Sequence, residues 1–262
     1  MSVLEKALKY LGVYKFYEKW LEDSVRSKPV PLHVGVILDG NRRWARSKGV
    51  PLEEGYRVGA RKVEDLLNWC LRLGIKILTV YAFSTENFKR KPEEVEAVMR
   101  VLEEVLQRAL KDERIHRYGV RVKALGRTWL LPANIQRLLR ELEEATAKYS
   151  NYYLNVAVAY GGRAEIIDAV RKMAELMVKG DVKPEDLSEE LFEKFLYTSH
   201  LPHPHPDLVI RTSGEERLSG FLLWQSAYSE LCFLDVYWPE FRYIDLLRAV
   251  RTYQKRQRRF GA

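Results

Sequence analysis

The sequence predicts a single α/β domain, with a mostly parallel sheet of about six strands flanked by helices. Six short runs are almost continuously apolar, which is typical of strands covered on both faces. These runs alternate with longer segments in which apolar residues recur at helical spacing. The 262 residues are 47% apolar and 31% charged, the balance of a folded chain with one large core. We see no repeat, linker or low-complexity segment, and therefore expect one domain over residues 1–262.

The pattern gives approximate bounds for each element. The expected strands are 33–38, 75–83, 120–125, 153–160, 208–211 and 231–236. The expected helices are 56–72, 92–110, 132–149 and 164–178. Pro92 stands in the first turn of its helix, where a missing N–H is tolerated. Cys70 and Cys232 each lie in an apolar run without Cys-x-x-Cys spacing, so we expect both to be reduced core residues.

The two ends of the chain have distinct patterns. Residues 1–30 predict an amphipathic helix, which either packs on the domain or lies at an interface with lipid or over the mouth of an apolar tunnel. Residues 248–262 predict a basic C-terminal arm. No targeting or membrane-spanning segment is visible, so we expect a cytoplasmic protein, with peripheral association at a membrane surface as the alternative.

The net charge of +8 indicates a phosphate-bearing partner, which could be a nucleic acid, an anionic membrane or a small phosphorylated substrate. No recognition helix or aromatic-basic platform is present, so nucleic acid is not the expected partner.

The most informative polar cluster follows the first strand and begins at Asp39. Gly40 permits a tight turn, the following amides can point at an anion, and Asn41 can cap a helix. Asp39 could hold a divalent cation and Arg43 could donate a fork of N–H groups to phosphate. The alternative is a capped turn with surface arginines.

Three further clusters stand at the ends of expected elements. Hydroxyl, carboxylate, amide and basic groups crowd the loop after the second strand. Two guanidiniums and a hydroxyl surround a glycine turn after the fifth strand, which suits a second diphosphate-sized anion. A lone acid at a helix-to-strand junction requires a partner or a metal. These residues are Ser84, Thr85, Glu86, Asn87 and Arg90; Arg211, Arg217 and Ser219; and Glu230.

Together these segments resemble the cis-prenyltransferases, the undecaprenyl diphosphate synthase family. The resemblance covers residues 33–261 and is carried by five motifs in order: HVGVILDGNRRW (33–44), YAFSTEN (81–87), YGGR (160–163), DLVIRTSGE (207–215) and FLLWQ (221–225). The Arg42-Arg43 pair and the N-terminal extension are more similar to the archaeal branch.

The resemblance implies an enzyme for cis-prenyl chain elongation. Isopentenyl diphosphate units would be condensed onto an allylic diphosphate primer, C15 or C20, giving a long-chain polyprenyl diphosphate as precursor of a glycosyl carrier lipid. A non-catalytic subunit of a heteromeric cis-prenyltransferase is the alternative, although such subunits typically lack the Asp-Gly-Asn-Arg motif retained here. A trans-prenyltransferase would need an Asp-Asp-x-x-Asp motif, and the sequence contains no Asp-Asp pair.

The resemblance also implies residue roles. The amides of Gly40, Asn41, Arg42 and Arg43, with the side chains of Arg43 and Arg90, would hold the primer diphosphate. Arg211, Arg217 and Ser219 would hold the diphosphate of isopentenyl diphosphate. Asp39 and Glu230 would bind Mg²⁺, and Asn87, near Ser84 and Glu86, would orient or relay the departing proton. Trp44 and Phe88 would keep water from the site.

The growing chain would need an apolar tunnel, whose wall could be the stripe Val95, Val98, Met99 and Leu102. Ordinary core is an equally good interpretation of this stripe.

Two positions depart from the usual bacterial pattern, because Leu52 and Tyr56 replace an Arg and a His.

The terminal Arg259-x-Gly261 is similar to a family motif that reaches into a partner subunit, which implies a homodimer. A solvated tail is the alternative.

Overall fold

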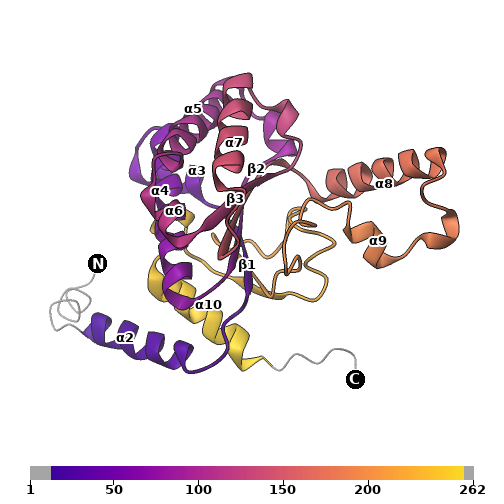
Figure 1. Cartoon of the computed structure of the whole chain (residues 1–262). Helices are drawn as coiled ribbons and strands as arrows, with labels where there is room; N and C mark the ends of the chain where they lie inside the picture. The colour runs from indigo at the N-terminus through magenta and orange to yellow at the C-terminus, as the bar shows by residue number, and fades with distance from the viewer. Residues whose placement is uncertain (1–12, 257–262) are drawn as a thin grey trace.

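The computed structural model describes residues 13–256, and its strands form one sheet in which every neighbour runs parallel (Figure 1). The sheet order is β3-β4-β2-β1-β5-β6. The strands are β1 His33–Ile37, β2 Ile77–Ser84, β3 Val120–Leu125, β4 Tyr152–Tyr160, β5 Leu208–Arg211 and β6 Glu230–Phe233. The predicted α/β class with six parallel strands is therefore confirmed.

Helices connect the strands and extend both ends of the described chain. They are α2 Val13–Arg26, α3 Asn41–Lys48, α4 Leu52–Leu73, α5 Pro92–Ala109, α6 Glu113–Tyr118, α7 Ala133–Thr146, α8 Gly162–Lys179, α9 Glu189–Glu193 and α10 Tyr243–Lys255. The four helices expected from periodicity are present as α4, α5, α7 and α8. Figure 1 shows α8 and α9 projecting away from the rest of the molecule.

One face of the sheet carries the main hydrophobic core. Alternate strand residues such as Val36 and Val80 are fully buried there, together with Leu66 of α4, Leu139 of α7 and Leu247 of α10. Burial of so many large aliphatic side chains supplies most of the driving force for folding. Cys70 and Cys232 are free thiols buried in this core, as predicted.

The other face is partly polar, which the continuous apolar runs did not predict. The fully buried His33 accepts a hydrogen bond on Nε2 from the Thr79 hydroxyl at 2.8 Å, and its Nδ1 lies 3.1 Å from the carbonyl oxygen of His203. Asn155 donates to the same Thr79 oxygen at 3.0 Å. These bonds satisfy polar groups that would otherwise destabilise the sheet interior.

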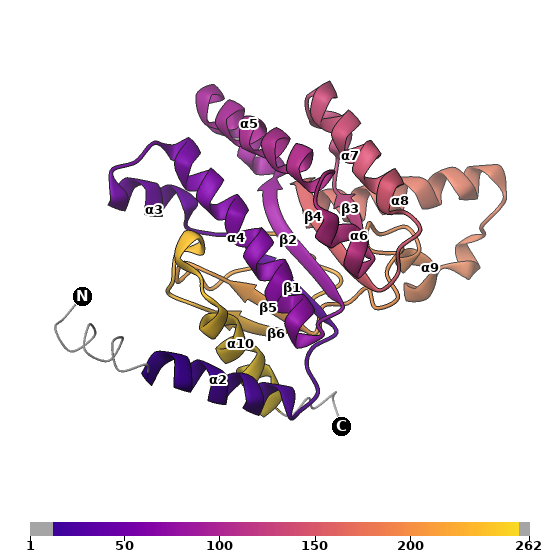
Figure 2. The same ribbon diagram turned by 60° about the vertical axis from the view of Figure 1, so that its left-hand side comes forward.

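The N-terminal helix packs on the domain over the part that the structure describes. Leu21 and Val25 of α2 are fully buried, and α2 lies against α10 (Figure 2). The buried Glu22 accepts hydrogen bonds from Arg72 of α4, one of them at 2.7 Å. Within residues 13–256, no helix is long and apolar enough to cross a bilayer.

The C-terminal prediction needs a correction. Residues 248–255 are not a free arm, because they continue α10, in which Ala249 and Val250 are fully buried. The remaining residues, 257–262, lie outside the described part.

The strand order indicates where on the sheet a ligand would bind. From β1 the chain moves to β2 on one side, and it later returns to β5 on the other side of β1. Ligands of parallel α/β sheets bind at such a switch point, at the carboxyl ends of the strands. Asp39 follows β1 and Arg211 ends β5, so two predicted site residues meet here.

The buried His33 predicts a specific pH dependence. Burial lowers its pKa from 6.5 to about 3, so below pH 6.5 the unfolded chain binds a proton that the folded chain excludes. Stability is therefore lost as the pH falls from 6.5 toward 3, by about 2 kcal/mol at pH 5 from this group. We expect His33→Gln to show a shallower decline of unfolding free energy between pH 6.5 and 5 in urea titrations. Equal slopes for variant and parent would contradict this assignment.

Candidate active site

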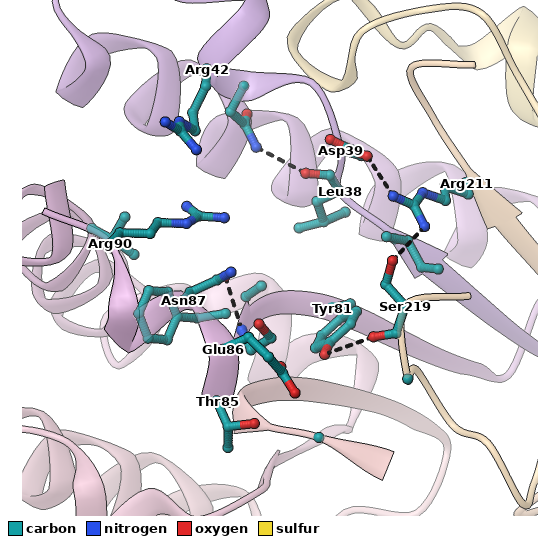
Figure 3. Close-up of a pocket in the computed structure, with 18 of the residues that line it drawn as sticks. Leu38, Asp39, Arg42, Tyr81, Thr85, Glu86, Asn87, Arg90, Arg211 and Ser219 are labelled. Carbon is teal, nitrogen blue, oxygen red and sulfur yellow. Dashed lines mark hydrogen bonds and ion pairs between the residues drawn. The ribbon is translucent and has the colours of Figure 1, made fainter. Parts of the chain in front are cut away.

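A cleft of about 980 Å³ opens at the carboxyl edge of the sheet (Figure 3). Its walls come from the ends of β1, β2, β4 and β5 and from the loops that follow them. Six arginines line it: Arg42, Arg43, Arg46, Arg90, Arg163 and Arg211. Such a density of guanidinium groups in one concave site is suited to a multiply charged anion.

The turn after β1 presents free backbone amides to this cleft. Gly40 has φ 106°, and a Cβ there would lie 2.9 Å from Cδ1 of Tyr237, so only glycine fits. α3 starts at Asn41, so its first amides point outward at the positive end of the helix. Asn41 does not cap the helix as predicted; its side chain donates to the Leu38 carbonyl at 3.0 Å.

Asp39 is held between two guanidiniums. Its Oδ2 accepts from Nη2 of Arg211 at 2.8 Å, and its Oδ1 accepts from Nη2 of Arg43 at 3.2 Å. Desolvation alone would raise the pKa of this half-buried carboxyl, but the Arg211 hydrogen bond and charge, and then Arg43, outweigh it and lower the pKa. Asp39 is therefore ionised at neutral pH.

The loop after β5 folds back over Arg211. The buried Arg211 donates through Nη1 to Oγ of Ser219 at 2.8 Å and to the carbonyl of Arg217. Ser219 has φ 48°, a left-handed conformation that a serine adopts only when its surroundings enforce it. The Arg217 side chain lies at the rim, 63% exposed and paired with Glu215. The structure thus brings Arg211 and Ser219 together as predicted and leaves Arg217 outside the lining.

The loop after β2 forms the opposite wall. A short 3₁₀ helix spans Thr85–Lys89, and the Ser84 amide donates to Oδ1 of Asn87 at 3.1 Å. Ser84, Thr85, Glu86, Asn87 and Arg90 all line the cleft, as expected from their crowding in one loop.

Sequence reasoning missed the N-terminus of α8 as part of this site. Gly161, Gly162 and Arg163 line the cleft, and the Gly162 amide donates to the Gly220 carbonyl at 2.8 Å. A Cβ on Gly162 would lie 2.5 Å from that carbonyl oxygen, so glycine permits the two loops to meet. The signal was present, since the YGGR motif follows a strand and opens a helix.

The structure does not bring every predicted residue into the cleft, and Glu230 is the main correction. Glu230 begins β6, at the amino end of the sheet opposite Asp39, and pairs with Arg256 at 2.6 Å. Within one chain, Asp39 and Glu230 therefore cannot bind the same ion. Because Glu230 directly precedes the expected strand 231–236 of a parallel sheet, the pattern already placed it at the edge opposite Asp39, and the prediction of a shared ion overlooked this.

Two predicted aromatic neighbours also lie elsewhere. Trp44 donates through Nε1 to Glu240 at 3.2 Å, and Phe88 packs edge-on against Phe83 with ring centroids 4.9 Å apart. Neither ring lines the cleft, where the aromatic residues are Tyr56, Tyr81 and Phe83. Arg259 and Gly261 lie outside the described residues.

An apolar cavity of about 460 Å³ adjoins the cleft. It lies between the sheet and helices α4, α5 and α7, and six residues line both spaces: Leu38, Asn41, Tyr56, Ala82, Phe83 and Val98. Of the predicted stripe, Val98 and Leu102 line the cavity, whereas Met99 is buried in the core. An arginine-lined cleft thus adjoins an apolar space along a shared wall.

The cleft suits Mg²⁺ only as an ion shared with a substrate. Among residues 13–256 no group of three His, Cys, Asp or Glu side chains could hold a metal by itself. Mg²⁺ commonly uses one or two carboxylates together with substrate phosphates and water, and the ionised Asp39 fits that role.

Comparisons with known proteins agree with this geometry. Residues 37–261 match the prenyltransferase family described as "Putative undecaprenyl diphosphate synthase". The chain is 54% identical over 250 residues to the tritrans,polycis-undecaprenyl-diphosphate synthase (geranylgeranyl-diphosphate specific) of Methanocaldococcus jannaschii, covering 95% of this chain and 89% of the relative. Identity to the synthase of the same description from Thermococcus kodakarensis is 55% over 249 residues, covering 95% and 94%. Lavandulyl diphosphate synthase from Lavandula x intermedia, crystallised with dimethylallyl diphosphate, superposes with a TM-score of 0.86 at 38% identity, covering 89% of this chain and 99% of that one.

Proposed function

Because this chain belongs to the undecaprenyl diphosphate synthase family of cis-prenyltransferases and is of the archaeal type, we propose that it condenses isopentenyl diphosphate onto geranylgeranyl diphosphate. The C20 primer is supported by the names of the archaeal relatives, which specify geranylgeranyl diphosphate. The product would be a long-chain polyprenyl diphosphate that serves as precursor of a glycosyl carrier lipid.

The observation that carries this proposal is the continuity of the two spaces. An arginine-lined cleft would bind the diphosphate end of an amphiphile, and the adjoining apolar cavity would act as the tunnel for its hydrocarbon. Phe83 and Val98 line both spaces and mark the boundary between the cleft and the cavity.

Each substrate would use its own group of donors. The amides of residues 41–43 with Arg43 and Arg90 would hold the primer diphosphate, and Arg211 with Ser219 would hold that of isopentenyl diphosphate. Asp39 accepts hydrogen bonds from Arg43 and Arg211 and would orient these two guanidiniums toward the diphosphates. When bound beside Asp39, Mg²⁺ would supply positive charge that stabilises the departing diphosphate.

The proton lost from isopentenyl diphosphate needs an acceptor. Asn87 lines the cleft and would orient this proton, but an amide is a poor base. A diphosphate oxygen is the better final acceptor. The rings of Tyr81 and Phe83 line the cleft and would limit access of water to the allylic cation.

The activity is tested by incubating the protein with radiolabelled isopentenyl diphosphate, Mg²⁺ and C10, C15 or C20 primers, and sizing the products. We expect elongation, most efficient with the C20 primer, and its loss when EDTA is added. Asp39→Ala should lower turnover at least a hundredfold with an unchanged circular dichroism spectrum. Absence of elongation with every primer would refute the proposal, and near-normal turnover of Asp39→Ala would refute the role of that carboxylate.

We further propose a homodimer formed through the projecting unit of α8 and α9. A groove of about 710 Å³ runs between these helices, lined by apolar residues that include Val170, Met173 and Phe192. Val170 is about half exposed, as an unpartnered face requires. A second copy of the chain is the occupant that the family resemblance implies.

Sedimentation equilibrium tests the dimer. We expect the parent to be a dimer and Val170→Glu to shift the equilibrium toward monomer, because a charge would be buried in the interface. Leu130→Glu, at an exposed position outside the groove, should remain dimeric. A monomeric parent would overturn the proposal.

Peripheral association with an anionic membrane is supported by α2. Phe16 and Trp20 are exposed one turn apart, and the guanidinium of Arg251 lies 5.1 Å from the Trp20 ring centroid. Exposed aromatic rings beside cations suit a lipid headgroup region.

We expect the protein to float with phosphatidylglycerol vesicles and not with phosphatidylcholine vesicles. The double substitution Phe16→Ser, Trp20→Ser should reduce flotation, whereas Trp129→Ser, at another exposed tryptophan, should not. Failure of the parent to float with either vesicle would rule out this association.

A further inference from the structure

Behind the primer side of the cleft lies a buried carboxylate that the proposed mechanism does not use. Glu94 belongs to the first turn of α5 and is only 7% exposed. Its Oε1 accepts from the Tyr56 hydroxyl at 2.8 Å and from Nη1 of Arg90 at 2.9 Å, and it lies 3.2 Å from Nε of Arg42. Three groups from α3, α4 and the loop after β2 thus converge on one oxygen.

The charges explain why this arrangement holds the two guanidiniums. Arg42 and Arg90 both line the cleft, and without a shared anion they would repel each other. Tyr56 adds a second link, because its hydroxyl accepts from Nη1 of Arg90 at 3.2 Å while donating to Glu94. The cluster of Glu94, Tyr56, Arg42 and Arg90 retains a net positive charge facing the cleft.

Both arginines keep donors available. The side chains of Arg42 and Arg90 are 42% and 27% exposed, and within residues 13–256 neither Nη atom of Arg42 has a hydrogen-bond partner. Figure 3 shows the two guanidiniums on one side of the cleft, facing Asp39 and Arg211 on the other. Arg42 and Arg90 thus share Glu94 on one side, and Arg43 and Arg211 share Asp39 on the other, where Glu215 also accepts from Arg43 at 3.0 Å.

Tyr56 also lies at the boundary between polar and apolar space. It lines both the cleft and the apolar cavity, with its hydroxyl committed to the charged cluster. An amphiphile crossing this boundary would pass its head beside the arginines and its tail beyond Tyr56.

We propose that Glu94 and Tyr56 are positioning residues, which hold Arg42 and Arg90 in place for the diphosphate of the allylic primer. This inference rests on the proposed function. It assigns the cluster to the primer because Tyr56, which is hydrogen-bonded to Glu94 and Arg90, lines both the cleft and the apolar cavity, where only the substrate with the long hydrocarbon reaches across. Isopentenyl diphosphate would be bound on the opposite side of the cleft, at Arg211 and Ser219.

Steady-state kinetics of Glu94→Gln and Tyr56→Phe, varying each substrate in turn, test the assignment. We expect Glu94→Gln to raise KM for the C20 primer at least about tenfold, with KM for isopentenyl diphosphate changed less than about twofold, since the charge-assisted hydrogen bond to Arg90 and the ion pair with Arg42 are lost. Tyr56→Phe should raise the primer KM by a smaller factor. The double variant should be no worse than Glu94→Gln, because among the residues that the structure describes the Tyr56 hydroxyl hydrogen-bonds only to Glu94 itself and to Arg90, which Glu94 also holds.

The control is Glu104→Gln on the same helix. Glu104 accepts from Arg57 at 3.0 Å on the outer surface and lines neither space, so both KM values should remain at the parental level. Should Glu94→Gln fail to fold by circular dichroism, Tyr56→Phe decides, because it removes one oxygen and no charge.

An unchanged primer KM in these variants, or an equal rise of both KM values, would overturn the positioning role while leaving the enzyme activity established by the parent. Absence of elongation by the parent would instead overturn the proposed function itself. Binding of inorganic diphosphate by calorimetry gives a readout without turnover: we expect it to be weakened in Glu94→Gln and not in Glu104→Gln.

Discussion

The ion pair between Asp39 and Arg211 is the constraint on which the site depends. It joins the end of β1 to the end of β5, the two strands that flank the switch point of the sheet. Other bonds converge on the same turn, because the Thr212 hydroxyl and the Trp238 amide both donate to the Asp39 carbonyl, at 2.7 and 3.0 Å. The fold thus fixes the carboxylate from side chain and backbone at once, which is how a rigid scaffold preorganises an anion site. Arg211 in turn holds the loop that carries Ser219.

The same principle of one carboxylate between two guanidiniums recurs at Glu94. An empty cleft with six lining arginines would be destabilised by their mutual repulsion unless acids were placed among them. Asp39 and Glu94 compensate part of this charge and leave the remainder for a ligand. The lowered pKa of Asp39 reflects the same attraction, since the arginines keep this carboxyl ionised despite its desolvation. In the proposed function, the contacts that stabilise the free protein would also determine its affinity for a diphosphate.

Much of this could be predicted from the sequence, for identifiable reasons. Strands buried on both faces leave long apolar runs, and polar residues directly after such runs must gather at one edge, so Asp39, Ser84 and Arg211 were predictable. Side-chain direction was not predictable in two cases: Trp44 of α3 turns toward Glu240, and Arg217, in the irregular segment after β5, lies at the rim. Glu230 directly precedes an apolar run, so the same rule places it at the edge opposite Asp39, where β6 begins. The Glu94 cluster joins residues from three elements and depends on tertiary contacts, so periodicity shows only that Glu94 lies in a first turn.

Helix α5 borders both the arginine-lined cleft and the apolar cavity. Its first turn supplies Glu94 to the charged cluster, and its later turns supply Val98, Leu102 and Val105 to the apolar cavity. The helix spans 18 residues, or roughly 27 Å, so one rigid element runs from the cleft along the apolar cavity. In the proposed reaction the new bond always forms at the charged end, and the existing chain must therefore advance along this helix with every addition. A helix whose N-terminal turn holds the arginines and whose remaining length forms the apolar wall keeps the diphosphate end in a constant position while the hydrocarbon moves.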